Sequence, residues 1–155
     1  MTDRLETIRT LYDARAPTYD TEVGFHPHQG ADYLKWMPLS PGKNALDLAC
    51  ETGAITIPSS KEVAPSGTVF GVDISPASPS IARDKATNHS LENATFVDHD
   101  IGALHDVEKI EEGMFDVITC ASAFVLLADP GSAVKSWAKL LKEVFCRELK
   151  KMAGP

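Results

Sequence analysis

From residue 44 onward, short apolar runs alternate with longer segments in which apolar residues recur at helical spacing. The apolar runs predict four buried strands: Ala45–Ala49, Thr68–Val72, Ala94–Val97 and Phe115–Cys120. The intervening segments predict crossover helices over Ala54–Ala64, Pro79–His89 and Gly102–Ile110. This alternation is typical of βαβ units, so the pattern predicts an α/β fold with a mostly parallel sheet.

Helical spacing also marks both flanks of this central region. Leu5–Ala16 predicts an amphipathic helix that ends at Pro17, and Gly30–Met37 predicts a second one, with Val23–His28 as a loop between them. Asp129 opens a further helix that we expect to continue through Glu143–Leu149. We therefore expect one domain over residues 1–155, with N-terminal helices and cap over 1–42, a ligand-binding βαβ core over 43–128 and a C-terminal helix over 129–155.

Composition narrows the classes of ligand. The chain has 155 residues, is 43% hydrophobic and carries a net charge of −7 without a lysine or arginine cluster. Nucleic acids and anionic membranes need concentrated positive charge, so a neutral or cationic small molecule is the better candidate. We also expect a cytoplasmic protein, because neither a signal peptide nor a membrane-spanning apolar run is found. Cys50, Cys120 and Cys146 are too few and too far apart for a disulfide framework or a metal site.

Acidic residues stand at the ends of the first two predicted strands. Asp47 ends the first, Gly53 follows in the turn, and Asp73 ends the second, twenty residues after Gly53. An acidic residue at the end of the second strand can accept hydrogen bonds from both ribose hydroxyls of a nucleoside. The first turn lacks Gly-x-Gly-x-x-Gly, which a dinucleotide needs for its pyrophosphate, so a dehydrogenase is disfavoured.

The segment from Leu46 to Gly53, LDLACETG, resembles motif I of class I S-adenosylmethionine-dependent methyltransferases. The stretch from Tyr12 to Asp20 resembles the N-terminal region of family members related to ubiquinone and menaquinone methyltransferases. Three further segments resemble the second, third and fourth motifs: Gly67–Ser75, Phe96–Ile101 and Phe115–Cys120. The resemblance covers about residues 10 to 142. It implies a Rossmann-like methyltransferase fold and methyl transfer from S-adenosylmethionine to an oxygen, nitrogen or carbon of a small metabolite.

The resemblance also implies which residues hold the cofactor. Asp73 would accept hydrogen bonds from the ribose hydroxyls, and Asp100 would accept a hydrogen bond from the adenine amino group. Tyr19 would close over the cofactor. The remaining positions are Asp47, Ala49 and Gly53 at the methionine end, Ile74 and the Ile101 N–H at the adenine, and the Cys120-Ala121 backbone at the methionine amino group. Two alternatives stay open: Asp100 as the cap of the following helix, and Tyr19 as a surface aromatic residue.

Catalytic residues are few in this chemistry, because proximity and orientation supply most of the rate. His26 or His28, in the predicted loop near the substrate, could take a proton from the acceptor. His89, His99 and His105 are expected to be solvated. Asp98, His99 and Asp100 are not expected to hold a metal ion, because successive strand residues point to opposite faces of a sheet and cannot converge on one ion.

Glu51 departs from the family pattern, which has glycine at this position. A glutamate adds bulk and charge in a turn that would lie against the methionine moiety. Its carboxylate could attract the cofactor's ammonium group and would repel the cofactor's carboxylate. We therefore expect Glu51 to lie in the cofactor site and to weaken cofactor affinity.

The C-terminal region is the second departure. The family continues with Pro-Gly-Gly and further strands in the order 3-2-1-4-5-7-6, whereas this chain ends in a predicted helix. We therefore expect a truncated sheet of about four strands that lacks the C-terminal ones. The strand Phe115–Cys120 would then have an open edge, which we expect to be covered by a second chain, as in a homodimer, or by the C-terminal helix.

Two classes of function follow from these features. The first is methyl transfer to a small metabolite, including secondary metabolites. The second is a methyltransferase scaffold that no longer methylates and acts as a cyclase, an isomerase or a partner subunit, which Glu51 and the missing strands favour. An altered coding end that leaves an inactive fragment is a third reading.

Overall fold

The computed structural model describes residues 3–22 and 26–143. A four-stranded parallel sheet in the order β3-β2-β1-β4 forms its centre. The strands are β1 (Ala45–Leu48), β2 (Val69–Asp73), β3 (Ala94–Asp98) and β4 (Val117–Cys120). All four strand predictions are confirmed to within two residues, and so is the Rossmann-like arrangement.

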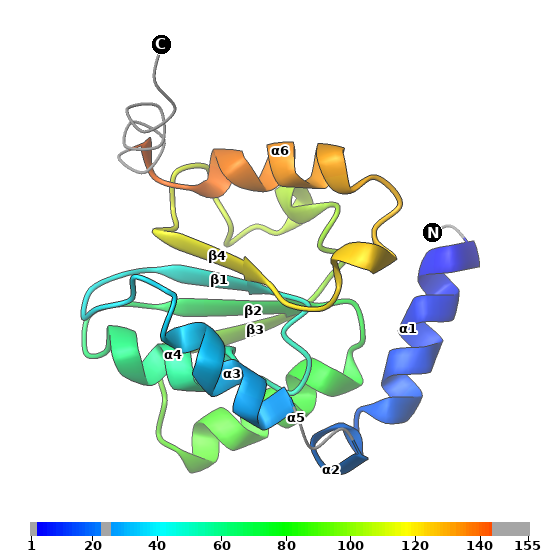
Figure 1. Cartoon of the computed structure of the whole chain (residues 1–155), viewed down its shortest axis with the longest axis horizontal. Coiled ribbons are helices and arrows are strands. Elements are labelled where there is room, and N and C mark those ends of the chain that lie inside the picture. Colours follow the sequence, from blue (N-terminus) through cyan, green and yellow to red (C-terminus); the bar gives the residue numbers. More distant parts are fainter. Residues whose placement is uncertain (1–2, 23–25, 144–155) are drawn as a thin grey trace.

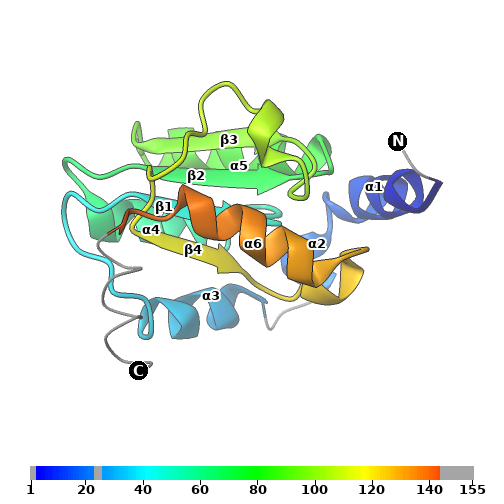
Figure 2. The same cartoon turned by 90° about the horizontal axis from the view of Figure 1, so that it is seen from above.

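Helices cover both faces of the sheet (Figures 1 and 2). On one face lie α3 (His26–Leu34), α4 (Thr56–Val63) and α5 (Ala77–Asn88), and on the other lies α6 (Pro130–Leu140). The N-terminal helix α1 (Asp3–Arg15) and the short α2 (Tyr19–Glu22) stand beside the carboxyl ends of the strands. Parallel α/β sheets bind ligands at this end, where the strand order reverses between β1 and β4.

The main core lies between the sheet and α6. Phe70 and Phe115 meet edge to face, with ring centroids 5.8 Å apart, and Phe115 is fully buried. Trp137 of α6 is buried in the same cluster, and its Nε1 donates to the Ile101 carbonyl at 2.8 Å. The packing of α6 therefore also fixes the loop that follows β3.

Two predicted segments differ from the structure. Residues 102–110 form only the 3₁₀ turn η1 (Leu104–Asp106) instead of a helix, because Leu104, Val107 and Ile110 are buried at intervals of three residues, which suits successive turns. The loop predicted over Val23–His28 is wrong from His26 onward, where α3 begins. That helix ends at Leu34, three residues before the predicted end at Met37. Residues 23–25 lie outside the described part of the chain.

The C-terminal helix ends earlier than predicted. After Leu140 the chain becomes extended, and Leu141 forms a parallel bridge with Phe115. The Phe115 amide donates to the Leu140 carbonyl, and the Phe115 carbonyl accepts from the Lys142 amide, both at 2.9 Å. The prediction of a continuous helix is thus wrong at Leu141 and Lys142, and residues 144–155 lie outside the described part. The predicted open edge is paired at its first residue by this backbone, while α6 covers a face of the sheet rather than the edge.

Candidate functional site

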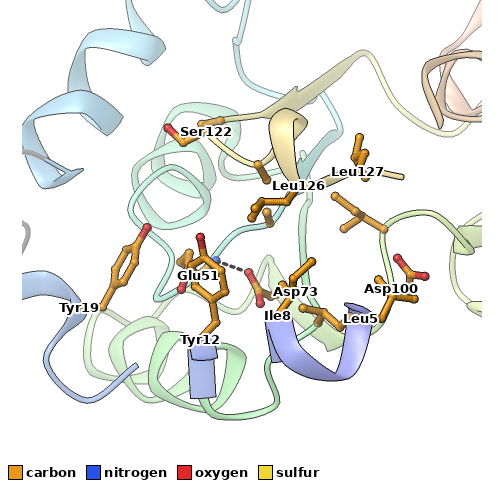
Figure 3. Close-up of a pocket in the computed structure, with 15 residues that line it drawn as sticks. Leu5, Ile8, Tyr12, Tyr19, Glu51, Asp73, Asp100, Ser122, Leu126 and Leu127 are labelled. Carbon is orange, nitrogen blue, oxygen red and sulfur yellow. Dashed lines mark hydrogen bonds between the residues drawn. The ribbon is translucent and has the colours of Figure 1, made fainter. Parts of the chain in front are cut away.

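A pocket opens at the carboxyl ends of the strands, between the sheet and α1 (Figure 3). The turn after β1, the ends of β2 and β3, and the segment around η2 (Phe124–Leu126) form its other walls. Its lining residues are Leu5, Ile8, Tyr12, Tyr19, Ala49, Glu51, Asp73, Ile74, Asp100, Ile101, Ala121, Ser122, Ala123, Leu126 and Leu127.

The turn after β1 has an unusual backbone. Ala49 and Glu51 both have left-handed conformations, with φ of 56° and 48°, and Gly53 follows with φ of 87°. Left-handed backbone costs about 1 kcal/mol at a residue with a side chain, whereas glycine adopts it freely. The glycine that the family has at position 51 therefore suits the backbone itself. Such strain is characteristic of ligand-binding turns.

The Glu51 side chain is held beside this turn. Its Oε2 accepts from the buried hydroxyl of Ser78 at 3.1 Å, and its backbone N–H donates to Asp73 Oδ2 at 3.0 Å (Figure 3). Burial, followed by the nearby Asp73 carboxylate, raises the pKa of Glu51 to about 8. Glu51 therefore carries a proton at neutral pH more often than it carries a charge.

Asp73 is fixed by the backbone around it. It is 4% exposed, and its two oxygens accept from the amides of Glu51 and Ser75, at 3.0 and 2.9 Å. Burial raises its pKa despite these hydrogen bonds. Each carboxylate oxygen has a second lone pair, so Asp73 can still accept two hydrogen bonds from a ligand in the pocket.

Asp47 lies beneath the turn rather than in this pocket. It is buried, and its carboxylate accepts from the hydroxyls of Thr56 on α4 at 2.6 Å and Thr119 on β4 at 2.8 Å. Burial raises its pKa to about 6. Asp47 thus joins three elements behind the turn, and Gly53 lies outside the pocket lining with it.

Polar contacts fasten α1 and α2 over the pocket. Asp13 of α1 accepts from the Ser75 hydroxyl at 2.5 Å and from the Ala77 amide at 3.2 Å, at the start of α5. Asp20 of α2 pairs with Lys85 of α5 and accepts from the Thr52 hydroxyl at 2.6 Å. Burial opposes its ionisation, but the hydrogen bonds from Lys85 and Thr52 hold the pKa of Asp20 below its ordinary value.

The α1 and α2 wall also brings two tyrosines to the pocket. The Arg15 guanidinium lies 5.6 Å from the ring centre of Tyr12 and 5.7 Å from that of Tyr19. Tyr19 is only 8% exposed, so it is not a surface aromatic residue. Burial, followed by Glu51, raises the pKa of both phenols.

The opposite wall combines apolar residues with one carboxylate. Ile74 and Ile101 line the pocket from the ends of β2 and β3. Asp100 lies between them in the lining, and its Oδ1 accepts from the Gly102 amide at 2.8 Å. This contact caps a turn rather than a helix, so Asp100 both shapes its own loop and faces the pocket.

A second cavity lies between α3 and β4 and shares Ala121 and Ser122 with the first. Tyr33, Trp36, Met37, Ile55, Thr119 and Cys120 complete its lining. Gly30 brings α3 close to the turn, since a Cβ there would lie 2.2 Å from the Ala54 carbonyl oxygen. Cys120 belongs to this second cavity and not to the first.

The structure thus gathers seven of the predicted site residues in the first pocket: Tyr19, Ala49, Glu51, Asp73, Ile74, Asp100 and Ile101. His26 and His28 fall at the start of α3, and their side chains lie outside the described part of the chain. Sequence reasoning missed Leu5, Ile8 and Tyr12 as pocket residues. Their spacing along α1 was the available signal, because it puts all three on one helix face.

The charges in the first pocket decide between classes of ligand. Glu51, Asp73 and Asp100 line it, and its lining contains no lysine, arginine or histidine among the described residues. A phosphate-bearing dinucleotide would be repelled by the Asp73 and Asp100 carboxylates, which have no basic side chain beside them in the lining, whereas a cationic nucleoside would be attracted. The family profile described as "Methyltransferase domain" matches residues 39–146.

The chain belongs to this methyltransferase-domain family. It has the fold of class I S-adenosylmethionine-dependent methyltransferases, as the sequence motifs predict. S-adenosylmethionine is the cofactor of the family, and the pocket lies where the motifs meet.

Individual relatives agree with this assignment. The demethylmenaquinone methyltransferase of Lactiplantibacillus plantarum is 27% identical over 143 residues, which are 89% of this chain and 59% of the relative. A methyltransferase structure from Aquifex aeolicus matches 84% of this chain and 67% of its own, with a TM-score of 0.71 at 19% identity. The [4+2]-cyclase SpnF matches 89% of this chain and 56% of its own, with a TM-score of 0.75 at 17% identity. The chain therefore spans between half and two thirds of the length of these proteins.

Among the described residues, no group of three or more histidine, cysteine, aspartate or glutamate side chains could hold a metal ion. None of the described helices has the length and hydropathy needed to cross a bilayer.

Replacing Glu51 with glutamine is expected to stabilise the ligand-free domain at pH 8.5 and to leave its stability nearly unchanged at pH 5. The folded pKa of about 8 lies above the ordinary value of 4.5, so wild-type stability falls as pH rises between these values. Glutamine does not titrate, so the gain should be about 4 kcal/mol larger at pH 8.5 than at pH 5. Urea unfolding at pH 5 and pH 8.5 measures the free energy of unfolding of both proteins. An equal difference between them at the two pH values would contradict a raised pKa of the buried Glu51 carboxyl.

Proposed function

We propose that this chain binds S-adenosylmethionine in the first pocket and methylates an apolar small molecule in the adjoining cavity. The observation that carries the proposal is the position of Asp73, a buried carboxylate held by two backbone amides and still lining the pocket. Ile74 and Ile101 supply apolar walls for an adenine ring. Asp100 supplies an acceptor for its amino group, and Ala49 and Glu51 lie where the methionine portion would extend.

The described residues fit that cofactor in charge. S-adenosylmethionine is a cationic nucleoside, and the pocket offers carboxylates without basic side chains. When bound, it supplies an activated methyl group. The chain's part is then to hold the nucleoside, to seal it under Tyr12 and Tyr19, and to bring an acceptor to the shared wall at Ala121 and Ser122.

The second cavity suits an aromatic acceptor. Tyr33 and Trp36 meet edge to face at 6.0 Å, and Trp36 is 78% exposed, which leaves one ring available to a ligand. The relative from Lactiplantibacillus plantarum is named for demethylmenaquinone, an apolar quinone. His26 and His28, on the same helix as Tyr33, remain candidates for taking the acceptor's proton.

Trp36→Ala is expected to weaken binding of 1,4-naphthoquinone, used as an acceptor probe, about tenfold without changing the affinity for S-adenosylmethionine. Calorimetry measures both. Val125→Ala, which removes another exposed apolar side chain (82% exposed), is the matched control and should change neither value. Equal losses in the two variants would count against an aromatic acceptor site.

Titration of S-adenosylmethionine and S-adenosylhomocysteine into the purified protein tests the cofactor proposal. We expect saturable one-to-one binding of both, with ATP as a control that does not bind because of its phosphates. If neither adenosyl ligand binds at millimolar concentration, the scaffold without methylating activity becomes the better reading, as the likeness to the cyclase SpnF suggests.

We also propose that a second copy of the chain covers the β4 edge beyond Phe115, as in a homodimer. Val117–Cys120 pairs with β1 on one side, and the described residues provide no strand on the other. Light scattering should give the mass of two chains, and a monomer at all concentrations would exclude the dimer.

A further inference from the structure

Glu51 lies in the cofactor pocket but has no assigned part in holding the adenosyl group. The family pattern has glycine here, and the strained left-handed backbone would suit glycine, so a side chain at this position carries a local cost. Its carboxyl group is anchored by the Ser78 hydroxyl at 3.1 Å instead of reaching into solvent. Glu51 is therefore a fixed acidic group in the wall.

The position of Glu51 relative to Asp73 places it near the centre of positive charge in a bound cofactor. The Glu51 amide donates directly to Asp73, the proposed ribose acceptor, at 3.0 Å. In S-adenosylmethionine the sulfonium is bonded to the 5′ carbon of that same ribose. The Asp73 carboxylate also raises the pKa of the Glu51 carboxyl, so the two acidic groups lie close enough to interact. A charge on the Glu51 carboxyl would therefore act on a sulfonium bound at that ribose, in a partly buried pocket where screening by water is weak.

We propose that Glu51 is a specificity-determining residue which, when ionised, favours the cationic sulfonium cofactor over its neutral thioether product. The proposal rests on the proposed function, since it assigns a selectivity to the same pocket. Methyl transfer converts the sulfonium into a thioether and so removes the charge that an ionised Glu51 prefers. The ionised residue therefore favours exchange of product for fresh cofactor.

Groups on every neighbouring element bear on the ionisation of Glu51. Asp73 on β2 and Asp20 on α2 oppose it, and Arg15 on α1 and the Ser78 hydroxyl on α5 favour it. Six further titratable groups line the cavities on either side of Glu51: Tyr12 on α1, Tyr19 on α2, Tyr33 on α3, Asp47 on β1, Cys50 in the turn and Asp100 after β3. Lys85 is engaged by Asp20, so it does not neutralise Glu51.

A cation bound beside this cluster shifts the balance toward the ionised form. Since burial holds the pKa of Glu51 at about 8, the free protein at pH 7.5 is mostly protonated at this residue. Binding of the sulfonium should release the Glu51 proton from a fraction of the protein molecules, whereas binding of the thioether should not. The preference for the sulfonium should therefore grow from pH 6.5 to pH 8.5.

The test compares the ratio of the dissociation constants for S-adenosylhomocysteine and S-adenosylmethionine in wild type and Glu51→Gln at pH 6.5 and 8.5. The α-ammonium group of each ligand titrates in the same range, but it does so equally for both proteins. We expect this ratio to rise with pH in wild type more than in Glu51→Gln. The wild-type ratio divided by the Glu51→Gln ratio should be about ten times larger at pH 8.5 than at pH 6.5. Glu62→Gln, on the exposed side of α4, should behave as wild type.

A second measurement needs no variant. Calorimetry of wild type at pH 7.5 in phosphate and in Tris, which differ in ionisation enthalpy, should show more proton release with S-adenosylmethionine than with S-adenosylhomocysteine. If both ligands bind with the same pH dependence in wild type and Glu51→Gln, the inference is overturned and the proposed cofactor stands. If neither ligand binds, the proposed function fails and the inference fails with it.

Discussion

Asp73→Asn is expected to weaken S-adenosylmethionine binding by about 100-fold, because two hydrogen bonds to a charged acceptor contribute about 1.5–3 kcal/mol each. Asparagine also presents an NH₂ group to the amides of Glu51 and Ser75, which both need an acceptor. The turn around Glu51 should therefore loosen as the ribose site is lost. Calorimetric titration measures the change in affinity.

Asp98→Asn is the matched control. Asp98 is the register partner of Asp73 on β3, but its side chain is 51% exposed and it does not line the pocket. Its replacement should change the affinity less than twofold, in line with surface substitutions. If circular dichroism shows that Asp73→Asn keeps its fold and the variant still binds with wild-type affinity, Asp73 is not part of the cofactor site.

Phe115→Ala is expected to lower the free energy of unfolding by about 3–5 kcal/mol, because it empties a fully buried position in the main core. The lost contacts include the edge-to-face packing on Phe70. The same residue pairs through its backbone with Leu141, so the connection from α6 to the sheet should loosen as well. Urea unfolding followed by fluorescence gives the difference.

Phe124→Ala is the control for Phe115→Ala. Phe124 also makes an edge-to-face contact, with Trp137 at 6.4 Å, but it is 43% exposed, so less than half of the Phe115→Ala loss is expected. A total stability of about 5–15 kcal/mol leaves Phe115→Ala close to unfolding. Phe115→Leu, which retains most of the volume, should cost about 1–2 kcal/mol and keeps the comparison measurable. Equal losses at positions 115 and 124 would contradict the assigned core.

The strands and the acidic residues at their ends were predictable from sequence because each depends on a local pattern. Asp73 ends an apolar run, and a parallel sheet brings such ends to one edge. The failure over residues 102–110 was also local, since buried residues three apart were assigned to an α-helix instead of 3₁₀ and other turns. The end of α6 at Leu140 depends on pairing with Phe115, 25 residues earlier, which no local pattern reveals.

The setting of Glu51 was the least predictable part of the site. The sequence predicts that its bulk and charge weaken cofactor affinity, which stays a prediction. The structure adds a left-handed backbone and a Ser78 hydroxyl, 27 residues away in the chain, that hold the side chain in the wall. The contact of Asp20 with Lys85, which fastens α2 across the pocket, joins residues that are 65 apart in sequence. Both depend on tertiary packing, so only the structure reveals them.

Residue-resolved NMR tests the central claim most directly, because it reports both binding and its location. On titration of S-adenosylhomocysteine into ¹⁵N-labelled protein, the amide signals of Glu51, Ile74 and Ile101 should move together and saturate. Those of the exposed Glu62 and Asn88, on α4 and α5, should stay in place. Unchanged signals at millimolar ligand, or shifts confined to the cavity of Tyr33 and Trp36, would contradict an adenosyl site over Asp73.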